Sequence, residues 1–344
     1  MKICIVTVYN SYNFGSFLQA KNLYNYILNQ GYDAVFYNGK SRKLFRACAR
    51  KIKKNIITNK SIIKIIKGTF FELKEYFILK KAWESLPSTC SRKGFDCVVV
   101  GSDEIWNISR LECQKDEFWA DGFDCPKISY APSINTTKSE LFLNSKYVEL
   151  LKKFDCISVR DEYSKKTLST YCNKSIDVVV DPTFLNSMSV SSETQNFIAV
   201  YLFYGSLTQQ EINDIISFAH SKNMKLVSLG QYISWCDKCI HSINGMPFYE
   251  YKNAKYVITN TFHGTAYAIN YRKQFITYSK GKNKIVELLD SFNLGNRDIT
   301  NENIMDKFNE IIDYSKINNK INNNIDHSKN YLCDAIRSVK KWKY

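Results

Sequence analysis

The 344-residue sequence predicts an α/β protein of two domains, each built around a parallel β-sheet. Three observations support this fold class. Short apolar runs alternate with helix-length segments along most of the chain, which is typical of parallel sheets with crossover helices. The alternation stops in a stretch rich in Ser and other small polar residues, 186–195, and then starts again. The length, with 44% hydrophobic residues, exceeds that of one ordinary domain.

The first unit of the pattern is a strand, a helix and a second strand. Residues 2–8 are an apolar run, and residues 16–30 carry apolar side chains at helical spacing. Gly31 ends the predicted helix, and residues 34–37 form the next apolar run. Parallel strands need such a crossover connection, so this β-α-β unit predicts a parallel sheet.

Later runs extend both domains. Further strands are predicted at 97–100, 127–130, 156–159 and 177–180, and then at 197–203, 225–229 and 256–259. Helices are predicted at 209–222 and after the His263-Gly264 turn. We therefore expect two Rossmann-like domains. The predicted divisions are 1–185 with a basic helical insertion at about 40–85, 196–320, and a C-terminal helix at 321–344 that packs back across the domains.

The formal net charge of +15 is concentrated in one segment. Residues 40–81 contain 14 Lys or Arg and only two carboxylates, Glu72 and Glu75, which gives this segment +12. The rest of the chain is nearly neutral, which disfavours a nucleic-acid surface and favours one local anionic partner. Isoleucines interleave with the cations, as in a helix at an anionic membrane surface. The alternative, weighed equally, is that a Lys-rich and Ile-rich composition serves solubility alone.

The cysteines and the N-terminal residues indicate a cytoplasmic protein, with the inner face of the plasma membrane as the place for any peripheral contact. Eleven cysteines at scattered spacings, several of them inside apolar runs, fit a reducing compartment. Cys236 and Cys239 form the one tight pair, for which free thiols are favoured over a zinc site, and we expect no metal. Residues 2–6 read as a buried strand rather than a signal peptide. No apolar run reaches the length of a membrane span.

Ligands of open α/β sheets bind at the carboxyl ends of the strands, so the loops after the strands are the candidate sites. In the first such loop, Asn13 precedes Gly15 and Ser16 at the start of a helix, where free N–H groups favour an anion. An ordinary loop with a helix cap is the alternative. In the second loop, Asp103 is a candidate to steer or deprotonate a sugar hydroxyl, although it could also cap the next helix. Trp106 and Asn107 follow as candidate contacts to an acceptor.

Two further loops carry a cation and a histidine. Arg160 ends a predicted strand, and its guanidinium can grip a phosphate or carboxylate with two parallel hydrogen bonds. A salt bridge to Asp161, Glu162 or Asp181 is the alternative. His263 lies in a tight turn between a strand and a helix and is the leading acid–base candidate, with a capping or structural role as its alternative.

Taken in order, six motifs resemble signatures of the polysaccharide pyruvyl transferase family. Each motif is weak alone, but six in the family's order, spread over most of the chain, form a specific pattern. They are Asn13-Phe14-Gly15 with Leu18-Gln19-Ala20, the run from Val100 to Asn107, Ser129-Tyr130-Ala131, Ile157-Ser158-Val159-Arg160-Asp161, Asp181-Pro182-Thr183 and Phe262-His263-Gly264.

The resemblance implies two Rossmann-like domains arranged as in B-type glycosyltransferases, with phosphoenolpyruvate held in the cleft by basic residues. Arg160 and His263 match ligand positions of the family. Some members have an arginine two residues before the histidine, where this chain has Thr261, and Lys284 is a candidate substitute. Phosphoenolpyruvate is expected as donor substrate, with no cofactor. The donor site would be Arg160, His263, Gly15, Ser16 and Lys284, and the acceptor site Asn13, Asp103, Trp106 and Asn107.

The implied reaction moves a pyruvyl group onto a sugar of a surface or capsular polysaccharide precursor as a ketal, with His263 and Asp103 as catalytic residues. Acceptors in this family are typically growing glycans, often lipid-linked, so residues 40–81 are predicted to contact an anionic membrane. Two alternatives stay open: a nucleotide-sugar-dependent glycosyltransferase of the same shape, and a non-catalytic glycan- or phosphate-binding subunit. The sequence identifies neither the acceptor sugar nor the oligomeric state.

Overall fold

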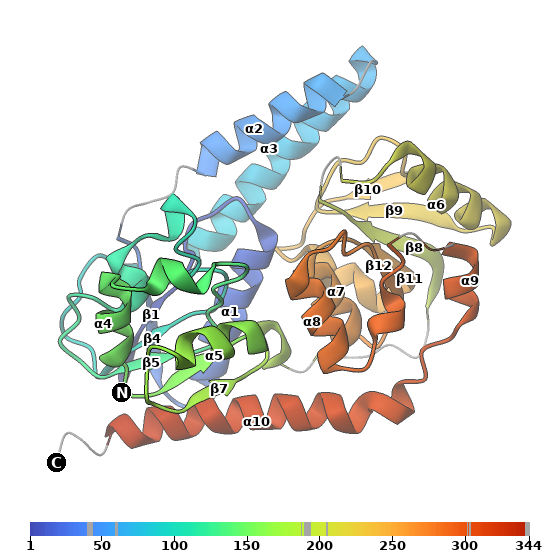
Figure 1. Ribbon diagram of the computed structural model, residues 1–344. Coiled ribbons are helices and arrows are strands. Elements are labelled where there is room, and N and C mark those ends of the chain that lie inside the picture. Colours follow the sequence, from blue (N-terminus) through green and yellow to red (C-terminus); the bar gives the residue numbers. More distant parts are fainter. Residues whose placement is uncertain are drawn as a thin grey trace. The chain divides into compact units, whose positions relative to one another are not determined.

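The structure is a computed structural model that describes residues 1–39, 44–58, 61–186, 188, 194–203, 206–300, 302 and 304–340 (Figure 1). The chain divides into two compact units. Unit 1 contains Met1–Arg42, Trp83–Asn186 and Asn319–Tyr344, and unit 2 contains Lys43–Ala82 and Ser187–Asn318. The predicted domains also separated near residue 186, but the structure assigns the insertion differently from the prediction, as described below.

Unit 1 contains a five-stranded parallel sheet with the strand order β3-β2-β1-β4-β5. A second pair, β6-β7, continues from β5 through a bridge between Ile128 and Cys156. Apolar side chains on both faces of β1 and β4 are buried, as expected for central strands covered on both sides. The strands are β1 (Lys2–Val6), β2 (Asp33–Tyr37), β3 (Ser88–Thr89), β4 (Cys97–Val100), β5 (Lys127–Ser129), β6 (Ile157–Val159) and β7 (Ile176–Val178).

The helices of unit 1 connect these strands. Asn13 caps the first of them, and Asp161 caps α5 by accepting from the Ser164 N–H. The last helix, α10, packs on unit 1 from residue 319 onward, where Tyr331 donates to the Ser129 carbonyl at 3.0 Å. Residues 341–344 of the predicted C-terminal helix lie outside the described residues. The α-helices are α1 (Phe14–Asn29), α4 (Lys146–Lys152), α5 (Glu162–Ser169) and α10 (Tyr314–Lys340), and the 3₁₀ helices are Leu111–Cys113, Asp116–Trp119, Ser139–Phe142 and Pro182–Phe184.

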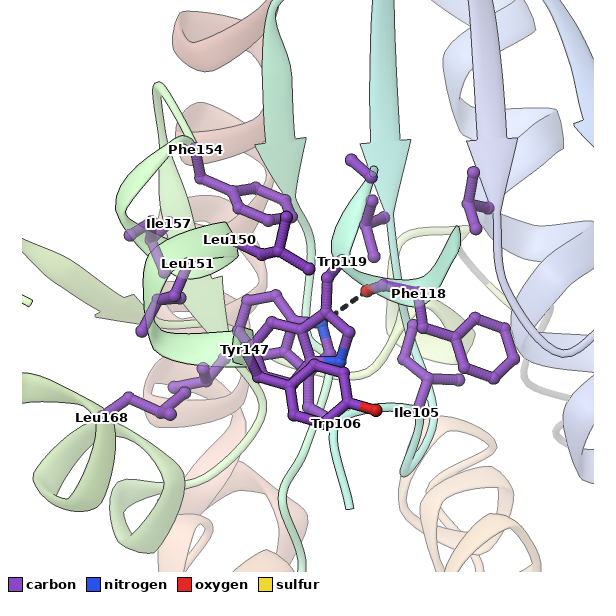
Figure 2. Packing of buried hydrophobic residues seen from close by; sticks show 14 of the residues in the cluster. Ile105, Trp106, Phe118, Trp119, Tyr147, Leu150, Leu151, Phe154, Ile157 and Leu168 are labelled. Atoms are coloured by element: carbon purple, nitrogen blue, oxygen red, sulfur yellow. Dashed lines mark hydrogen bonds between the residues drawn. The ribbon is translucent and has the colours of Figure 1, made fainter. Parts of the chain in front are cut away.

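The apolar core of unit 1 lies beside β4 and its following loop. Trp106 and Trp119 stack with their ring centroids 4.7 Å apart and their planes 9° from parallel, and Phe154 meets Trp106 edge to face (Figure 2). The Trp106 indole N–H donates to the Phe118 carbonyl at 2.7 Å, which satisfies its one polar atom inside the core. These rings hold the segment after β4 against the sheet.

Unit 2 repeats the design with the strand order β10-β9-β8-β11-β12, again parallel throughout. Its core contains Ile198, Val200 and Ile258 from the central strands, and Phe218 of α6 stacks on Phe308 of α9 at 4.6 Å. The strands are β8 (Gln195–Tyr201), β9 (Lys225–Leu229), β10 (Lys238–Ile240), β11 (Ala254–Thr259) and β12 (Gln274–Thr277). The helices are α2 (Leu44–Thr58), α3 (Ile62–Glu84, of which the last two residues belong to unit 1), α6 (Gln209–Ser221), α7 (Phe262–Asn270), α8 (Asn283–Ser291) and α9 (Ile304–Asn309), with 3₁₀ turns at Pro247–Asn253 and Gly295–Arg297.

The basic insertion folds with unit 2, which corrects its predicted place in the N-terminal domain. Phe71 of α3 stacks on His241 with ring centroids 4.0 Å apart. The buried Glu75 accepts hydrogen bonds from the Ser242 N–H at 2.8 Å and the Ser242 hydroxyl at 2.7 Å, and lies 2.7 Å from His241 Nδ1. These contacts join segments more than 160 residues apart, so chain order alone could not reveal them. Residues 40–43, 59 and 60 of the predicted insertion lie outside the described residues.

The two sheets share one topology. Numbering the strands within each unit gives the order 3-2-1-4-5 in both, which is that of a Rossmann-like sheet with a topological switch point between strands 1 and 4. The short strands β3, β10 and β12 were missing from the sequence prediction. In unit 1 the loops after β1 and β4 meet at the switch point, and in unit 2 those after β8 and β11 meet there.

Within the described residues, no helix has the length and apolar character that a membrane span requires.

Candidate active site

The switch point of unit 1 brings together the loops that follow β1 and β4. Ser16, in the first turn of α1, donates its hydroxyl to Asp103 Oδ2 at 2.7 Å. The other carboxylate oxygen of Asp103 accepts from the Glu104 N–H at 2.8 Å. Asp103 is half-buried and has a φ of 80°, so backbone and side chain are both held in place. The sequence placed both residues in a candidate site, and the structure joins them directly.

Gly101 allows the chain to turn after β4. Its φ is 134°, and a Cβ atom there would lie 1.9 Å from the Tyr130 carbonyl oxygen, which is far inside contact distance. The next residue, Ser102, is fully buried and donates to the Ala131 carbonyl at 2.8 Å. The close approach of this loop to the end of β5 sets the position from which Asp103 projects.

The loop after β1 acts as a helix cap, the alternative that the sequence left open. The side chain of Asn13 accepts hydrogen bonds from the Gly15 N–H at 2.9 Å and the Ser16 N–H at 3.4 Å. These are two of the N–H groups that were predicted to attract an anion. Asn13 itself is exposed. The hydroxyl of Ser16 contributes to the site through Asp103, while its N–H is used by the cap.

Two of the predicted acceptor contacts, Trp106 and Asn107, are buried and do not fit that role. Trp106 has no exposed surface and stacks inside the core described above. Asn107 is 2% exposed, and its side-chain oxygen accepts from Thr137 at 2.8 Å and from Ser109. Aromatic and amide side chains in a loop after a strand resemble sugar contacts in sequence, but here burial makes them structural.

Arg160 forms a buried ion pair with Asp181 at 3.3 Å, and its side chain is 5% exposed. Asp181 also accepts from the Ser102 hydroxyl at 3.2 Å. Burial by itself lowers the pKa of Arg160, but the negative charges of Asp181 and Asp103 outweigh it and raise the pKa above its ordinary value. The salt bridge that the sequence left as an alternative is therefore present. It links Arg160 to the loop after β4, so the cation lies in the same polar network as Asp103.

The turn that bears His263 lies at the switch point of unit 2. Thr261 caps α7 by accepting from the Gly264 N–H at 3.0 Å. A Cβ atom on Gly264 would lie 2.1 Å from the Thr259 hydroxyl oxygen, so only glycine lets α7 start this close to the end of β11. His263 is the second residue of the helix, is half-buried, and meets Phe262 edge to face at 5.2 Å.

A lysine missed by the sequence analysis lies beside this turn. Lys282 follows β12 and donates to the Asn260 carbonyl at 3.0 Å, immediately before the Thr261 cap. Burial lowers the pKa of Lys282, and the charge of the predicted site residue Lys284 lowers it further. An anion bound here would oppose both effects and raise the pKa of Lys282. A lysine in a polar loop gives no sequence signal of its own, because only folding brings the end of β12 next to the end of β11.

Asn260 ties the two loops of this switch point together. Its side-chain amide contacts the hydroxyl of Ser206, and its backbone carbonyl accepts from Lys282. Beside this loop are two cavities of about 250 Å³ each, and Phe203, just beyond the end of β8, lines both. The Lys282 ammonium lies 5.8 Å from the centre of the Phe203 ring, which places one cation close to this open space, whereas His263 lines neither cavity.

The candidate residues fall into two groups. Asp103, Ser16 and Arg160 belong to unit 1, while His263 and Lys284, together with Lys282, belong to unit 2. Unit 1 offers a fixed carboxylate and a guanidinium, and unit 2 offers an imidazole and ammonium groups. In the part of the chain that the structure describes, no group of three or more His, Cys, Asp or Glu is placed to hold a metal ion.

Comparison with solved structures shows the same fold elsewhere. UDP-GlcNAc 2-epimerase from Neisseria meningitidis, bound to UDP-GlcNAc, matches with a TM-score of 0.54 and 10% identity, covering 98% of this chain and 100% of that one. The UDP-GlcNAc 2-epimerase from Methanocaldococcus jannaschii matches with a TM-score of 0.47 and 10% identity over 90% and 91% of the two chains. A ugt transferase from Siraitia grosvenorii in complex with UDP gives 0.49 and 8% over both full chains.

The first of these likenesses supports the predicted fold class, two Rossmann-like domains of the kind found in B-type glycosyltransferases and related epimerases. At 10% identity it shows the fold alone. The chain has no match among curated proteins. A family model matches residues 13–280, which is most of the chain; the match begins at the Asn13 cap of α1 and includes the loops after β4, β8 and β11. The chain therefore belongs to the polysaccharide pyruvyl transferase family.

Proposed function

We propose that this protein transfers the pyruvyl group of phosphoenolpyruvate onto two hydroxyls of one sugar in a surface or capsular polysaccharide precursor. The products are a cyclic pyruvate ketal and inorganic phosphate. Family membership over residues 13–280 is the observation that carries the proposal. The polar groups at the two switch points support it, because the reaction needs an acid, a base and cations for a trianionic donor.

The reaction balances without an external oxidant or reductant. A proton is added to the methylene carbon of the donor, and positive charge develops on the neighbouring carbon that bears the phosphate. One sugar hydroxyl forms a C–O bond to that carbon and loses its proton. The C–O bond to phosphate then breaks, the second hydroxyl attacks the same carbon, and its proton is released. The protonation of the methylene carbon and the two hydroxyl attacks each move a proton near neutral pH, and side chains of suitable basicity accelerate such steps.

His263 is the proposed acid for the first step. Imidazole gives and takes protons near neutral pH, and His263 is fixed in the first turn of α7 by the Thr261 cap and the close packing of Gly264. A positioned general acid contributes about 10²–10⁴ in rate. Of the four histidines, His241 is held by Glu75, whereas His220 lies exposed at the end of α6.

Cations hold the donor in this proposal. Lys282 lies beside the His263 turn, and Lys284 is two residues further along the chain. In this proposal their ammonium groups bind the phosphate or carboxylate, as a substitute for the arginine that some family members have at the position of Thr261. Arg160 is largely buried in its pair with Asp181, so its part in this proposal is the positive end of that ion pair. Asp103 serves as base for the sugar hydroxyl, with Ser16 as its positioning residue.

The test measures phosphate release from phosphoenolpyruvate with and without a glycan acceptor isolated from the host, and mass spectrometry follows the pyruvylated product. We expect acceptor-dependent release by the wild type. His263→Ala should lower the rate by about 10²-fold or more, while the exposed histidine variant His220→Ala should keep it. Both variants should melt as the wild type does, because neither histidine lies in the apolar core.

Thermal melting with ligands separates the rival functions. Stabilisation by phosphoenolpyruvate supports pyruvyl transfer, because a ligand raises stability only when the native state binds it. Stabilisation by uridine or guanosine diphosphate sugars, with no response to phosphoenolpyruvate, would indicate a nucleotide-sugar-dependent glycosyltransferase. Binding of a glycan with no phosphate release by the wild type would leave a non-catalytic subunit.

A further inference from the structure

The hairpin formed by α2 and α3 exposes large apolar side chains. The helices lie side by side (Figure 1), and Asn55 of α2 donates to the Ile65 carbonyl of α3 at 3.0 Å. This pairing brings several isoleucines to the end of the hairpin where the two helices join. Ile57 and Ile62 are 72% and 73% exposed. The exposed residues at this end and just beyond it are Ile56, Ile57, Ile62, Ile63, Ile66 and Phe70.

The opposite face of the hairpin attaches it to unit 2. Phe71 and Glu75 make the contacts with His241 and Ser242 described above, and Phe71 also lies near the ring of Tyr232 at 6.3 Å. The exposed isoleucines take no part in this attachment. Large apolar patches are rarely exposed to solvent on soluble proteins. Where such a patch occurs, it often marks a site of interaction with a protein or a membrane.

The charge of this surface is of one sign. Within residues 44–58 and 61–82 the carboxylates are Glu72 and Glu75, and both are buried. Glu72 lies 3.7 Å from Lys51, and Glu75 is held by Ser242. Glu84, the last residue of α3, is exposed, but the other exposed charges of the described hairpin are positive, and among them are Arg46, Arg50, Lys53, Lys64, Lys67 and Lys74. Two copies of such a surface would repel each other, whereas an anionic surface would attract it.

A cavity between the hairpin and the loops after β8 and β9 is also rich in cations. It has a volume of about 250 Å³, and its lining includes three cations of α2, Arg50, Lys51 and Lys54, and one carboxylate of α3, Glu72, which lies 3.7 Å from Lys51. Phe203 and Tyr232, from the loops after β8 and β9, complete the wall. The ammonium group of Lys54 lies 5.9 Å from the centre of the Phe203 ring. Cations beside aromatic side chains suit an amphiphilic ligand, in which a phosphate group is joined to a hydrocarbon chain.

We propose that the α2–α3 hairpin docks the protein on a lipid surface rich in anionic phospholipid. The isoleucines insert at the boundary between headgroups and acyl chains, and the surrounding Lys and Arg contact the lipid phosphates, as in interfacial amphipathic helices. The cavity beside Phe203 takes one lipid phosphate. Because Phe203 lies just beyond β8, at the switch point of unit 2, docking would bring lipid phosphates to the loops that carry His263. The docking itself does not depend on the reaction proposed above.

The test uses the full-length protein and floated vesicles. One set contains phosphatidylcholine alone, and the other contains phosphatidylcholine with phosphatidylglycerol. We expect the wild type to float with the second set and to remain below with the first. Raising the salt concentration should weaken but not abolish the binding, because screening acts on the cations and leaves apolar insertion in place.

Two variants separate the apolar and charged contributions. The double variant Ile57→Asp, Ile62→Asp should lower the partition coefficient about tenfold or more. The triple variant Lys53→Gln, Lys64→Gln, Lys67→Gln should do the same on anionic vesicles. The matched controls change exposed residues elsewhere: Leu111→Asp with Ile311→Asp, and Lys153→Gln with Lys225→Gln and Lys255→Gln. These controls should bind as the wild type does. All substituted side chains are exposed, so melting temperatures should stay the same.

Three outcomes would overturn the proposal. The first is equal recovery of the wild type below the gradient with both vesicle sets. The second is an equal loss of binding in the hairpin and control variants, which would indicate a dependence on net charge or total apolar surface alone. The third is a lipid-free wild type that sediments as a dimer, becomes a monomer in the isoleucine variant and fails to float; the hairpin would then bind a second copy of the chain.

Discussion

The hydroxyl of Ser16 donates a 2.7 Å hydrogen bond to the carboxylate of Asp103, although the residues are 87 positions apart in the chain. The bond joins the loop after β1 to the loop after β4. In a Rossmann-like sheet these two loops lie side by side at the switch point, so the contact follows from strand order. Together with the hydrogen bond from the Glu104 N–H to the other oxygen, it fixes the orientation of the Asp103 carboxylate.

The first prediction concerns this pair. If Asp103 accepts a proton from the sugar hydroxyl, Asp103→Asn should lower kcat by about 10²–10⁴, because an amide cannot take up that proton. Ser16→Ala should lower kcat less, with the KM for phosphoenolpyruvate nearly unchanged, because the carboxylate stays present but loses its orientation. Steady-state kinetics across pH check both. Asp124→Asn, at an exposed site, is the control. Unchanged kinetics in Asp103→Asn would remove this residue from the mechanism.

The second prediction concerns the buried pair of Arg160 and Asp181. Asp181→Asn leaves a buried guanidinium without its counter-charge and should lower the free energy of unfolding by about 3 kcal/mol or more. The exposed pair of Asp334 and Arg337, 3.6 Å apart, is the matched control, where Asp334→Asn should change it by less than about 1 kcal/mol. Urea unfolding measures both.

A companion variant tests whether Arg160 also holds the donor. Arg160→Lys keeps the charge but cannot form two parallel hydrogen bonds. The stabilisation by phosphoenolpyruvate should fall in this variant if the guanidinium contacts the donor. A full melting shift with phosphoenolpyruvate in Arg160→Lys would confine Arg160 to its structural pair.

The third prediction concerns the attachment of the α2–α3 hairpin. Glu75→Ala removes the acceptor for the Ser242 N–H and hydroxyl, both at a buried site, and should destabilise unit 2 by about 3 kcal/mol. The hairpin is rich in Lys and Arg, so trypsin should cut within 44–82 faster than in the wild type. The exposed Glu140→Ala should leave the digestion pattern unchanged. Equal digestion rates in all three proteins would contradict the anchoring role of Glu75.

The fourth prediction concerns the pH dependence of stability. Lys273 is 4% exposed and donates to the Ala254 carbonyl at 3.1 Å, and burial lowers its pKa from 10.5 to about 8. Between pH 8 and 10.5 the unfolded chain binds this proton more strongly than the folded one, so stability from this group rises with pH. The gain is on the order of 2 kcal/mol between pH 8 and pH 10.

Urea unfolding of the wild type and Lys273→Met over this range isolates the effect. The stability of the wild type relative to the variant should increase as the pH rises. The exposed Lys255→Met should show no such trend relative to the wild type. A difference between the wild type and Lys273→Met that stays constant with pH would contradict the lowered pKa.

Local patterns in the sequence were sufficient for the fold class and for the loops that carry chemistry. Apolar runs of strand length and the helical spacing of residues 16–30 predicted both Rossmann-like halves, because a parallel strand that is buried on both faces consists mostly of apolar residues. The short strands β10 and β12 were missed, because three or four residues are too few to show an apolar run or an alternation of apolar and polar residues. The six motifs likewise predicted the family, which the match over residues 13–280 confirms.

Burial and long-range pairing were decided by the tertiary structure alone. Trp106 and Asn107 read as sugar contacts in sequence, yet packing against Trp119 and Thr137 encloses them. Lys282 gained its place beside the His263 turn only when β12 aligned with β11. The insertion joined unit 2 through Glu75 and Ser242, 167 positions apart. A sequence shows which side chains are polar and which are apolar. Which residues far apart in the chain come into contact depends on the free energy of the whole folded protein.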